Sequence, residues 1–505
     1  MNYLSTIKKM REKIAKNEGF DVVIIVTSPG NFPYWQWRLQ KTRNKILSPK
    51  TELIIVEEDW GEGGAGQLLG TLYGIKKASK KVDIIKALSE NKSIAVYHTA
   101  GYGKRMAPLC GTEGNNKPGI KLPWPVLIEG KRSFFTLLEG VIFTTQAFAK
   151  TREGRVCVFW TDQIIIPSRP FRRETNLPVE IFAIKAPFSL NPNEWRRKWQ
   201  RYGILIKRKG LGVVQREKLS WSQFKKLLEK LKIKPGPSGK LDLYKSLGCF
   251  SIDGNLLNLL MKEFSQELEI KKRNLETDIH LWMPLTTTRK EYGELGQSVI
   301  YWQRIKNLKL KYQKEFGKKL ILGEKNLGED TIWWDYGNLA SYHESILKLI
   351  SPSVEGKVAR ELFEMSPYFI SKKKERNLYI KNSIVFESQI DKGQIKNSVI
   401  LSSNLKWASL ERGAVIKSRL KGIQGRNLLL YYVEEDKRLK VQDREVLTDI
   451  VIPGGTRIRM RTTLLRDSKK DWTVRLPQNP FSYSEVERCL ARLADGAFKI
   501  KLARL

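Results

Sequence analysis

The chain has 505 residues, more than one hydrophobic core usually supports, and 41% of them are apolar, which excludes a disordered protein and favours two or three domains. Its formal net charge of +38 comes from 91 Lys and Arg against 53 Asp and Glu, and it attracts polyanions. The cations are spread along the chain without a helix-turn-helix or RRM-type motif, so anionic small substrates fit this charge as well as nucleic acid does.

Cysteine usage and hydropathy indicate the compartment. The four cysteines, Cys110, Cys157, Cys249 and Cys489, form no CxxC pair and so specify neither a zinc site nor a disulfide framework. Residues 1–20 lack the apolar core of a signal peptide, and no segment approaches the roughly 20 apolar residues that a membrane span needs. We expect a cytoplasmic protein without a membrane partner.

Short apolar runs in the first part of the chain predict a sheet. They alternate with helical or turn-rich stretches and occupy residues 22–27, 53–56, 94–97, 156–160 and 181–184. Such alternation is typical of an α/β domain with a mostly parallel, Rossmann-like sheet.

A glycine-rich turn at residues 61–66 lies between the second and third runs and precedes a helical segment at 67–78. Its residues Gly63, Gly64 and Gly66 stand at the start of that helix, where backbone N–H groups can hold an anion. A flexible turn of small residues explains the pattern equally well.

A second glycine turn follows the third run and is rich in cations. Gly101 and Gly103 let backbone N–H groups approach phosphate oxygens, while Lys104, Arg105 and the downstream Lys117 neutralise charge. This pattern predicts a nucleoside triphosphate site, although Gly-x-Gly pairs also occur by chance as tight turns.

Residues after 187 become rich in Trp and Lys, with strand-like runs at 202–206 and 211–215, so we expect insertions around 190–250 and 290–325. The loop at 234–239 contains two prolines and two glycines and belongs on the surface. Lys218 follows the second of these runs, where it is either a point charge for a phosphate monoester or one more surface lysine.

Three carboxylates stand where strand-like segments end: Asp162, Asp278 and Asp335. Ligands of open α/β sheets bind beyond the carboxyl ends of strands, and Mg²⁺ prefers carboxylate oxygens together with substrate phosphates. Asp162 and Asp335 are the predicted Mg²⁺ ligands. The alternative is a turn or helix cap, the more common role for such an Asp, and Asp278 fits it.

From residue 377 a short phrase recurs. It reads Ile-Lys-Asn-Ser at 380–383 and 395–398 and Ile-Lys-Ser at 416–418, a period close to one coil of a parallel β-helix. An ordinary β-meander also produces such spacing. Residues 482–493 are amphipathic and predict a capping helix.

These elements, in this order, resemble the sugar-1-phosphate nucleotidyltransferases. The superfamily loop reads roughly Gly-x-Gly-x-Arg-Leu-x-Pro followed by Lys-Pro, and a Glu-Lys and a Trp-x-Asp-x-Gly come later. The loop residues that match here are Gly101, Gly103, Arg105, Met106, Pro108, Lys117 and Pro118. The spacing from Arg105 to Lys117 is longer than in the superfamily, which leaves Lys121 as the alternative lysine.

Within the superfamily, the chain is most similar to the GDP-fucose pyrophosphorylases (fucose-1-phosphate guanylyltransferases). The shared elements are Gly63-Gly64-Ala65, the His-x-x-Gly-Tyr loop at 98–102 and the segment 215–223 with Lys218. The resemblance is patchy and extends over most of residues 20–430. The chain lacks the kinase loop that some plant relatives carry.

The resemblance implies a GT-A type catalytic domain at 1–375, a left-handed parallel β-helix at 376–430 and a basic C-terminal region with capping elements at 431–505. It further implies transfer of a nucleotide from a nucleoside triphosphate, with GTP favoured, to a sugar-1-phosphate, with fucose-1-phosphate favoured, and homo-oligomers through the β-helix are compatible with it. The alternatives are another hexose-1-phosphate, a basic RNA-binding protein and a catalytically silent regulatory homologue.

Overall fold

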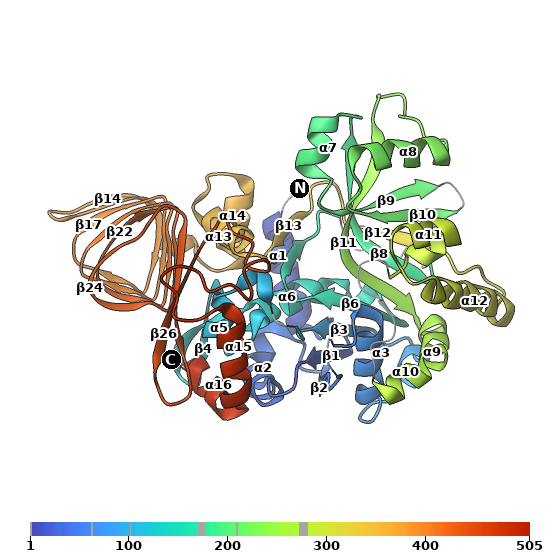
Figure 1. Ribbon diagram of the computed structural model, residues 1–505, viewed down its shortest axis with the longest axis horizontal. Coiled ribbons are helices and arrows are strands. Elements are labelled where there is room, and N and C mark those ends of the chain that lie inside the picture. The colour runs from blue at the N-terminus through green and yellow to red at the C-terminus, as the bar shows by residue number, and fades with distance from the viewer. Residues whose placement is uncertain are drawn as a thin grey trace.

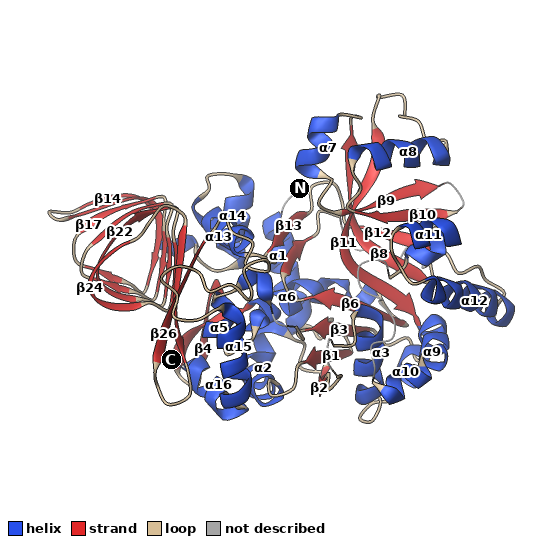
Figure 2. Cartoon of the chain, in the orientation of Figure 1, coloured by secondary structure: helices blue, strands red, loops and turns tan. Residues whose placement is uncertain are grey.

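The computed structural model describes residues 3–61, 64–101, 103–169, 177–208, 211–271 and 281–504. In these ranges a mixed sheet with helices on both faces is joined to a curled sheet built from later strands (Figure 1). Helices surround the first sheet, whereas the curled sheet is almost entirely strand (Figure 2). The predicted α/β class is confirmed, and the parallel part of the sheet is consistent with a Rossmann-like fold, but antiparallel pairings make the sheet mixed rather than mostly parallel.

The strands of the mixed sheet are β1 (Val22–Thr27), β2 (Glu52–Glu57), β3 (Ile94–His98), β6 (Arg155–Trp160), β8 (Val179–Phe188), β9 (Gly203–Arg208), β10 (Gly212–Glu217), β11 (Leu241–Asp253) and β12 (Leu322–Asn326). They follow the order β10-β9-β11-β6-β3-β1-β2, with β8 paired to β11 and β12 to β8. β1, β2, β3 and β6 are parallel neighbours, and β11 is antiparallel to β6. The five apolar runs of the sequence all belong to this sheet, as β1, β2, β3, β6 and β8.

Alternate residues of β1 enter two different cores. Val23 and Ile25 pack with α1 (Tyr3–Ala15), α2 (Phe32–Ile46) and α6 (Leu137–Thr145), whereas Val22 and Ile24 pack with the opposite group of helices. That group contains α3 (Gln67–Ala78), α4 (Ile84–Ser89), α9 (Gly254–Glu263), α10 (Ser265–Ile270) and α12 (Val299–Phe316). A strand buried on both faces reads as a continuous apolar run, which explains why β1 lacks polar alternation.

The order of the parallel strands reverses at β1. The chain goes from β1 to β2 on one side and then returns to β3 on the other, so the loops after β1 and β3 leave in opposite directions. A crevice opens at such a reversal, beyond the carboxyl ends of the strands, and ligands of open α/β sheets bind there.

An insertion packs on β9, β10 and the first half of β11. Its helices are α7 (Pro192–Lys198) and α8 (Trp221–Leu231), which enclose a small core around Phe188, Trp195 and Phe224. In Figure 1 this lobe stands apart from the rest of the mixed sheet. The remaining α-helices in the described ranges are α5 (Leu109–Thr112), α11 (Arg289–Glu294), α13 (Leu339–Leu347), α14 (Val354–Leu362), α15 (Tyr483–Leu493) and α16 (Gly496–Arg504).

Two short strand pairs lie outside the large sheets. β4 (Lys121–Ile128) pairs with β5 (Lys131–Thr136), and β7 (Gln163–Ile166) pairs with β13 (Ile332–Asp335). The second pair joins a segment from the middle of the catalytic region proposed from the sequence to one near its end.

The curled sheet consists of β14 (Phe369–Lys374), β15 (Leu378–Phe386), β16 (Gln389–Ile390), β17 (Gly393–Lys396), β18 (Val399–Leu401), β19 (Asn404–Leu405), β20 (Ala408–Glu411), β21 (Ala414–Ile416), β22 (Arg419–Arg426), β23 (Leu429–Tyr431), β24 (Glu434–Lys440), β25 (Glu445–Val451) and β26 (Arg457–Thr463). β15, β17 and β20 are parallel neighbours, with Ile380 opposite Ile395 and Ile395 opposite Leu410. The recurring phrase at 380 and 395 therefore marks stacked strands. A left-handed β-helix remains a prediction.

The third copy of the phrase belongs to another row of strands. Ile416 lies opposite Leu401 rather than Leu410. It therefore lies on a different side of the curled sheet from Ile395, which explains the longer spacing between the two copies. Buried serines accompany the stack: Ser383 Oγ accepts the N–H of Ser398 (3.1 Å), and Ser398 Oγ accepts the N–H of Gly413 (3.0 Å).

Two further expectations can be compared with the structure. The four cysteines are free, and three of them are buried. Throughout the described ranges, the helices lack the combination of length and apolarity that crossing a bilayer requires.

Candidate functional site

The loop after β3 is built on glycines with left-handed backbone. Gly101 has φ +117° and Gly103 has φ +62°, conformations that side chains with a Cβ rarely adopt. An ideal Cβ on Gly103 would lie 2.7 Å from the Cβ of Lys117, so glycine is also needed for the two segments to approach each other. Lys104 and Arg105 follow directly in a short 3₁₀ turn.

The pair β7–β13 brings two distant carboxylates to one place. Asp162 immediately precedes β7, Asp335 ends β13, and the register sets Asp335 opposite Gln163. The N–H of Tyr336 donates to the carbonyl oxygen of Asp162 (2.8 Å), which fixes the end of the pair. β6, which leads into Asp162, is the parallel neighbour of β3, so the glycine loop emerges beside these carboxylates.

Four charged side chains meet at Gly337. A Cβ on this glycine would lie 2.8 Å from Asp335 Oδ1, 3.4 Å from Asp162 Oδ2 and 3.5 Å from Arg105 Nη2. Lys117 Nζ contacts the same Asp162 Oδ2 at 2.5 Å. Arg105, Lys117, Asp162 and Asp335 are thus one cluster, which we call the Gly337 cluster.

The two carboxyls of the cluster titrate in opposite directions. Burial raises the pKa of Asp162, but Lys117 and Arg105 outweigh this effect and hold it below its usual range. Burial and the nearby Asp162 charge together raise the pKa of Asp335. Asp335 therefore carries a negative charge that its neighbours only partly compensate.

The donor chemistry of the cluster fits Mg²⁺. Two carboxylates face one point, and their mutual repulsion is the kind of strain that a hard divalent cation relieves. In the described ranges, no group of three or more acidic, His or Cys side chains is arranged to hold a metal by itself. A cation at this site would thus need oxygen ligands from water or substrate as well, which is usual for Mg²⁺.

Lys121, the alternative to Lys117, lies in a different environment. Its side chain is 1% exposed and pairs with Glu113 at 2.6 Å, next to the curled sheet. Among the two lysines, Lys117 is the one in contact with the Gly337 cluster.

The glycine turn before α3 is only partly described. Gly63 lies outside the described residues, as does Asp278. Gly64 has φ +67° and Gly66 φ +75°, and the N–H of Ala65 between them donates to Glu58 Oε1 (3.0 Å). The Glu58 carboxylate thus already accepts one N–H of this turn. Because that N–H is no longer free for an anion, the turn is better suited to contact a nucleobase than a phosphate.

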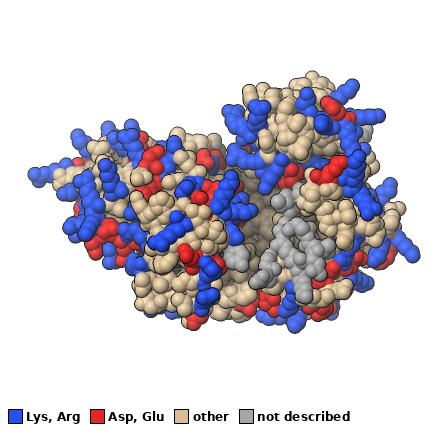
Figure 3. Space-filling model, in the orientation of Figure 1, with Lys and Arg blue, Asp and Glu red and all other residues tan. Residues whose placement is uncertain are grey.

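Lys218 lies in the lobe. It has left-handed backbone (φ +50°), its side chain is exposed, and its N–H donates to the carbonyl oxygen of Tyr202 (3.2 Å). No contact among the described residues joins its side chain to the Gly337 cluster. On the face shown in Figure 3, the surface is hollowed where the lobe meets the rest of the molecule, with Lys and Arg side chains along the rim.

Glu217 is a functional candidate that the sequence motif alone did not single out. Burial raises the pKa of its partly buried carboxyl to about 7, and Gln215 Nε2 donates to it (3.0 Å). Glu58 is a second functional candidate that the motif did not single out. The signal available in the sequence was only their position, since Glu217 ends β10 and Glu58 follows β2.

We expect Glu217 to make the folding stability pH-dependent. Its pKa rises from 4.5 to about 7 on folding, so the native state binds the extra proton and stability falls as pH increases through this window, by on the order of 3 kcal/mol in total. Urea unfolding of wild type and Glu217→Gln at pH 5 and pH 8 measures the effect. The variant should gain stability relative to wild type at the higher pH; an equal difference at both values would contradict the assignment.

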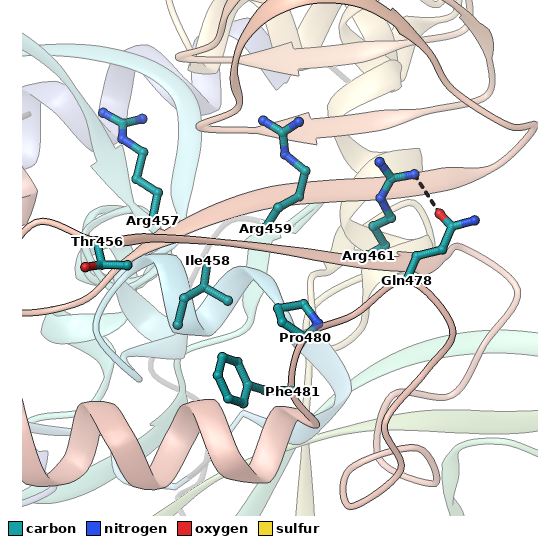
Figure 4. A pocket seen from close by; sticks show the side chains of 8 residues that line it. All are labelled: Thr456, Arg457, Ile458, Arg459, Arg461, Gln478, Pro480 and Phe481. Atoms are coloured by element: carbon teal, nitrogen blue, oxygen red, sulfur yellow. Dashed lines mark hydrogen bonds between the residues drawn. The ribbon is translucent and has the colours of Figure 1, made fainter.

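A pocket between β26 and the segment before α15 in the C-terminal part is a poor candidate site. It has a volume of about 390 Å³ and is lined by residues of β26 and of the segment before α15. Figure 4 shows Arg457, Arg459 and Arg461 side by side on β26. Each forms a salt bridge, at 3.0 Å to Glu434, 2.7 Å to Asp449 and 3.2 Å to Glu445, respectively. Their charge is already neutralised, so the Gly337 cluster remains the better candidate.

Comparisons with known proteins identify no family for this chain. No family model and no curated protein matches the sequence. A provisionally named glucose-1-phosphate thymidylyltransferase from Bacillus anthracis, solved in complex with a sucrose, aligns over 65% of this chain and 94% of its own, with 11% identity and a TM-score of 0.20. HddC from Yersinia pseudotuberculosis aligns over 65% of this chain and 99% of its own, with 9% identity and a TM-score of 0.22. Likeness at this level carries no argument about function.

Proposed function

We propose that this chain is a nucleotidyltransferase that joins a nucleoside triphosphate to a sugar-1-phosphate, with GTP and fucose-1-phosphate as the favoured pair. The observation that supports it is the Gly337 cluster, in which two cations and two carboxylates from distant segments meet beside a glycine loop. Polyphosphate chemistry needs this combination of positioning and charge neutralisation. The choice of base and sugar rests on the resemblance of residues 63–65, 98–102 and 215–223 alone.

In the proposed reaction, a phosphate oxygen of the sugar-1-phosphate forms a bond to the α-phosphorus while the bond from that phosphorus to the β-phosphate oxygen breaks. Pyrophosphate leaves with the electron pair. Arg105 and the N–H groups around Gly101, Gly103 and Lys104 bind the β- and γ-phosphates, and Lys117 neutralises charge that grows on the α-phosphate. Lys218 receives the sugar phosphate, and Gly64 and Gly66, with Gly63, approach the base.

Asp162 and Asp335 are the residues that would hold Mg²⁺. When bound, the ion neutralises phosphate charge and orients the phosphate chain. In its absence the two carboxylates would repel the triphosphate, so we expect chelation with EDTA to abolish turnover and added Mg²⁺ to restore it.

The domain arrangement is part of the proposal. Residues 1–375 form the catalytic domain, residues 376–430 a left-handed β-helix that joins copies of the chain, and residues 431–505 a basic region with capping elements; β14 (Phe369–Lys374), at the end of the first range, already pairs with β15 of the curled sheet. The 15-residue register of stacked strands supports the helix. We place the protein in the cytoplasm because its cysteines are free.

A pyrophosphate-release screen tests the function. Each common nucleoside triphosphate is combined with several sugar-1-phosphates in the presence of Mg²⁺, and a strong signal is expected for GTP with fucose-1-phosphate. A signal with another pair would support the proposed reaction but assign it different substrates. Absence of any signal, together with tight and salt-sensitive RNA binding, would favour the alternative suggested by the +38 charge.

Gly337→Ala provides a geometric prediction. The added methyl would lie 2.8 Å from Asp335 Oδ1, closer than real Cβ contacts allow, so the carboxylate must move. Small displacements of this kind cost about tenfold to a hundredfold in kcat/KM. Gly293→Ala is the matched control, because its Cβ would meet only Val299 at 3.6 Å. Equal kcat/KM for both variants would mean that the space beside Gly337 is not used.

A further inference from the structure

Lys245 is a cation that forms no salt bridge with any residue that the structure describes. It lies on β11, its side chain is partly buried, and its Nζ is 5.2 Å from the ring centre of Trp199 and 4.9 Å from that of Tyr202. Across the described parts of the chain, no carboxylate lies within salt-bridge distance of it. Two aromatic rings attract a cation but supply only part of the solvation that burial removes.

Other charges around Lys245 are mostly positive. Burial is the largest cause that lowers its pKa, followed by Lys198 and Arg201, while Glu194 acts in the opposite direction. Glu194 itself pairs with Lys198 at 3.3 Å. The partly buried ammonium thus sits in a region of excess positive charge, which an anionic ligand would compensate.

Contacts connect Lys245 to both parts of the proposed site. The Tyr202 ring lies 5.1 Å from that of Trp333, and Trp333 Nε1 donates to Gln163, the residue after Asp162 (3.0 Å). On its other side, Tyr202 accepts the N–H of Lys218 through its carbonyl oxygen (3.2 Å). Tyr202 therefore spans the distance between Lys218 and the strand that carries Asp335.

Sheet order separates two anion-binding regions. The glycine loop with Arg105 leaves β3 on one side of β6, whereas Lys245 belongs to β11 on the other side. Asp162 follows β6, between them. A transfer reaction needs this layout, because the donor phosphates and the acceptor phosphate must approach the same centre from opposite sides.

We propose that Lys245 binds the phosphate monoester of the acceptor substrate together with Lys218. The inference rests on the proposed function for the identity of the acceptor, but the anion site itself can be tested without turnover. Its ligand class is a dianionic phosphate monoester, and the nucleoside triphosphate does not use it.

Binding of inorganic phosphate tests the site directly. Isothermal titration calorimetry with phosphate is compared for wild type, Lys245→Gln and Lys306→Gln. Lys306 is a close match for Lys245, since it is also partly buried and its Nζ lies 5.0 Å from the ring centre of Trp302, but it lies on α12. Loss of one charged hydrogen bond should weaken phosphate binding about tenfold to a hundredfold in the Lys245 variant and not in the control. Equal affinity in all three proteins would overturn the proposal.

Steady-state kinetics distinguish the acceptor from the donor. Lys245→Gln should raise KM for the sugar-1-phosphate by a similar factor and leave KM for the nucleoside triphosphate unchanged, and Lys245→Arg should restore part of the affinity. A larger effect on the triphosphate would refute the assignment. If no pair of substrates reacts but phosphate affinity still depends on Lys245, the anion site stands and the proposed function fails.

Discussion

Arg105→Ala is expected to lower kcat/KM for nucleotidyl transfer by about a hundredfold or more, in a protein that remains folded. The side chain is exposed and forms no salt bridge with any described residue, so its removal should cost little stability. Its Nη2 lies close to the Cβ position of Gly337, where a bound phosphate chain would need compensation. Removal of one preorganised charge at such a centre typically raises the barrier by about 3 kcal/mol.

Asp162→Asn should have an effect of the same size for a different reason. The substitution keeps the shape but leaves Lys117 without its carboxylate partner and removes one of the two candidate Mg²⁺ ligands. We therefore expect the residual activity to require a higher Mg²⁺ concentration than wild type, as an Mg²⁺ titration of the rate would show. Arg492→Ala, an exposed cation on α15, is the control. Near-normal rates for Arg105→Ala or Asp162→Asn at saturating Mg²⁺ would disprove the assignment.

Arg38→Met is expected to cost about 3–5 kcal/mol of folding stability, the largest stability effect that we predict. Arg38 on α2 and Glu139 on α6 are both 0% exposed, and they form two hydrogen bonds of 2.9 and 2.8 Å. Removal of the cation leaves Glu139 buried without an opposite charge, with only the two hydrogen bonds that Thr136 donates to it, and an unpaired buried charge is strongly destabilising. Denaturant unfolding measures the loss.

The double variant provides the control for this pair. Arg38→Met with Glu139→Gln removes both charges, so it should be clearly less destabilised than the sum of the single variants. The exposed pair of Lys86 and Glu90, with side chains 72% and 45% exposed, should contribute less than about 1 kcal/mol. Additive losses for Arg38 and Glu139 would show that the two charges do not depend on each other.

Local patterns in the sequence were sufficient for much of the fold. The helix predicted at 67–78 is α3, and the helix at 482–493 is α15, with Ser482 as its N-cap. The apolar runs became β1, β2, β3, β6 and β8, because strands buried on both faces need continuous apolar residues. The pair β4–β5 was not predicted because Pro123 and Pro125 interrupt the strand pattern of β4, and β7–β13 was not predicted because each strand has only four residues and its partner is distant in sequence.

The candidate site, like the fold, could be predicted only in part from the sequence. The glycine loop could be predicted from residues 101–105 because positive φ and close approach require glycine. The sequence favoured Lys117 because Pro118 follows it, but the long spacing from Arg105 left Lys121 open, and only their different partners, Asp162 and Glu113, distinguish the two lysines. Lys245 gave no signal in a chain with 91 Lys and Arg, and only its position over two rings distinguishes it.

The pairing of β7 with β13 also sets when the Gly337 cluster can assemble during synthesis. Residues 163–166 leave the ribosome long before 332–335, and until then the earlier segment has no strand to pair with. A nascent chain that has already completed β1, β2, β3 and β6 would therefore present its glycine loop while still lacking its second acidic group. Premature termination anywhere before residue 335 should yield a product without the assembled centre.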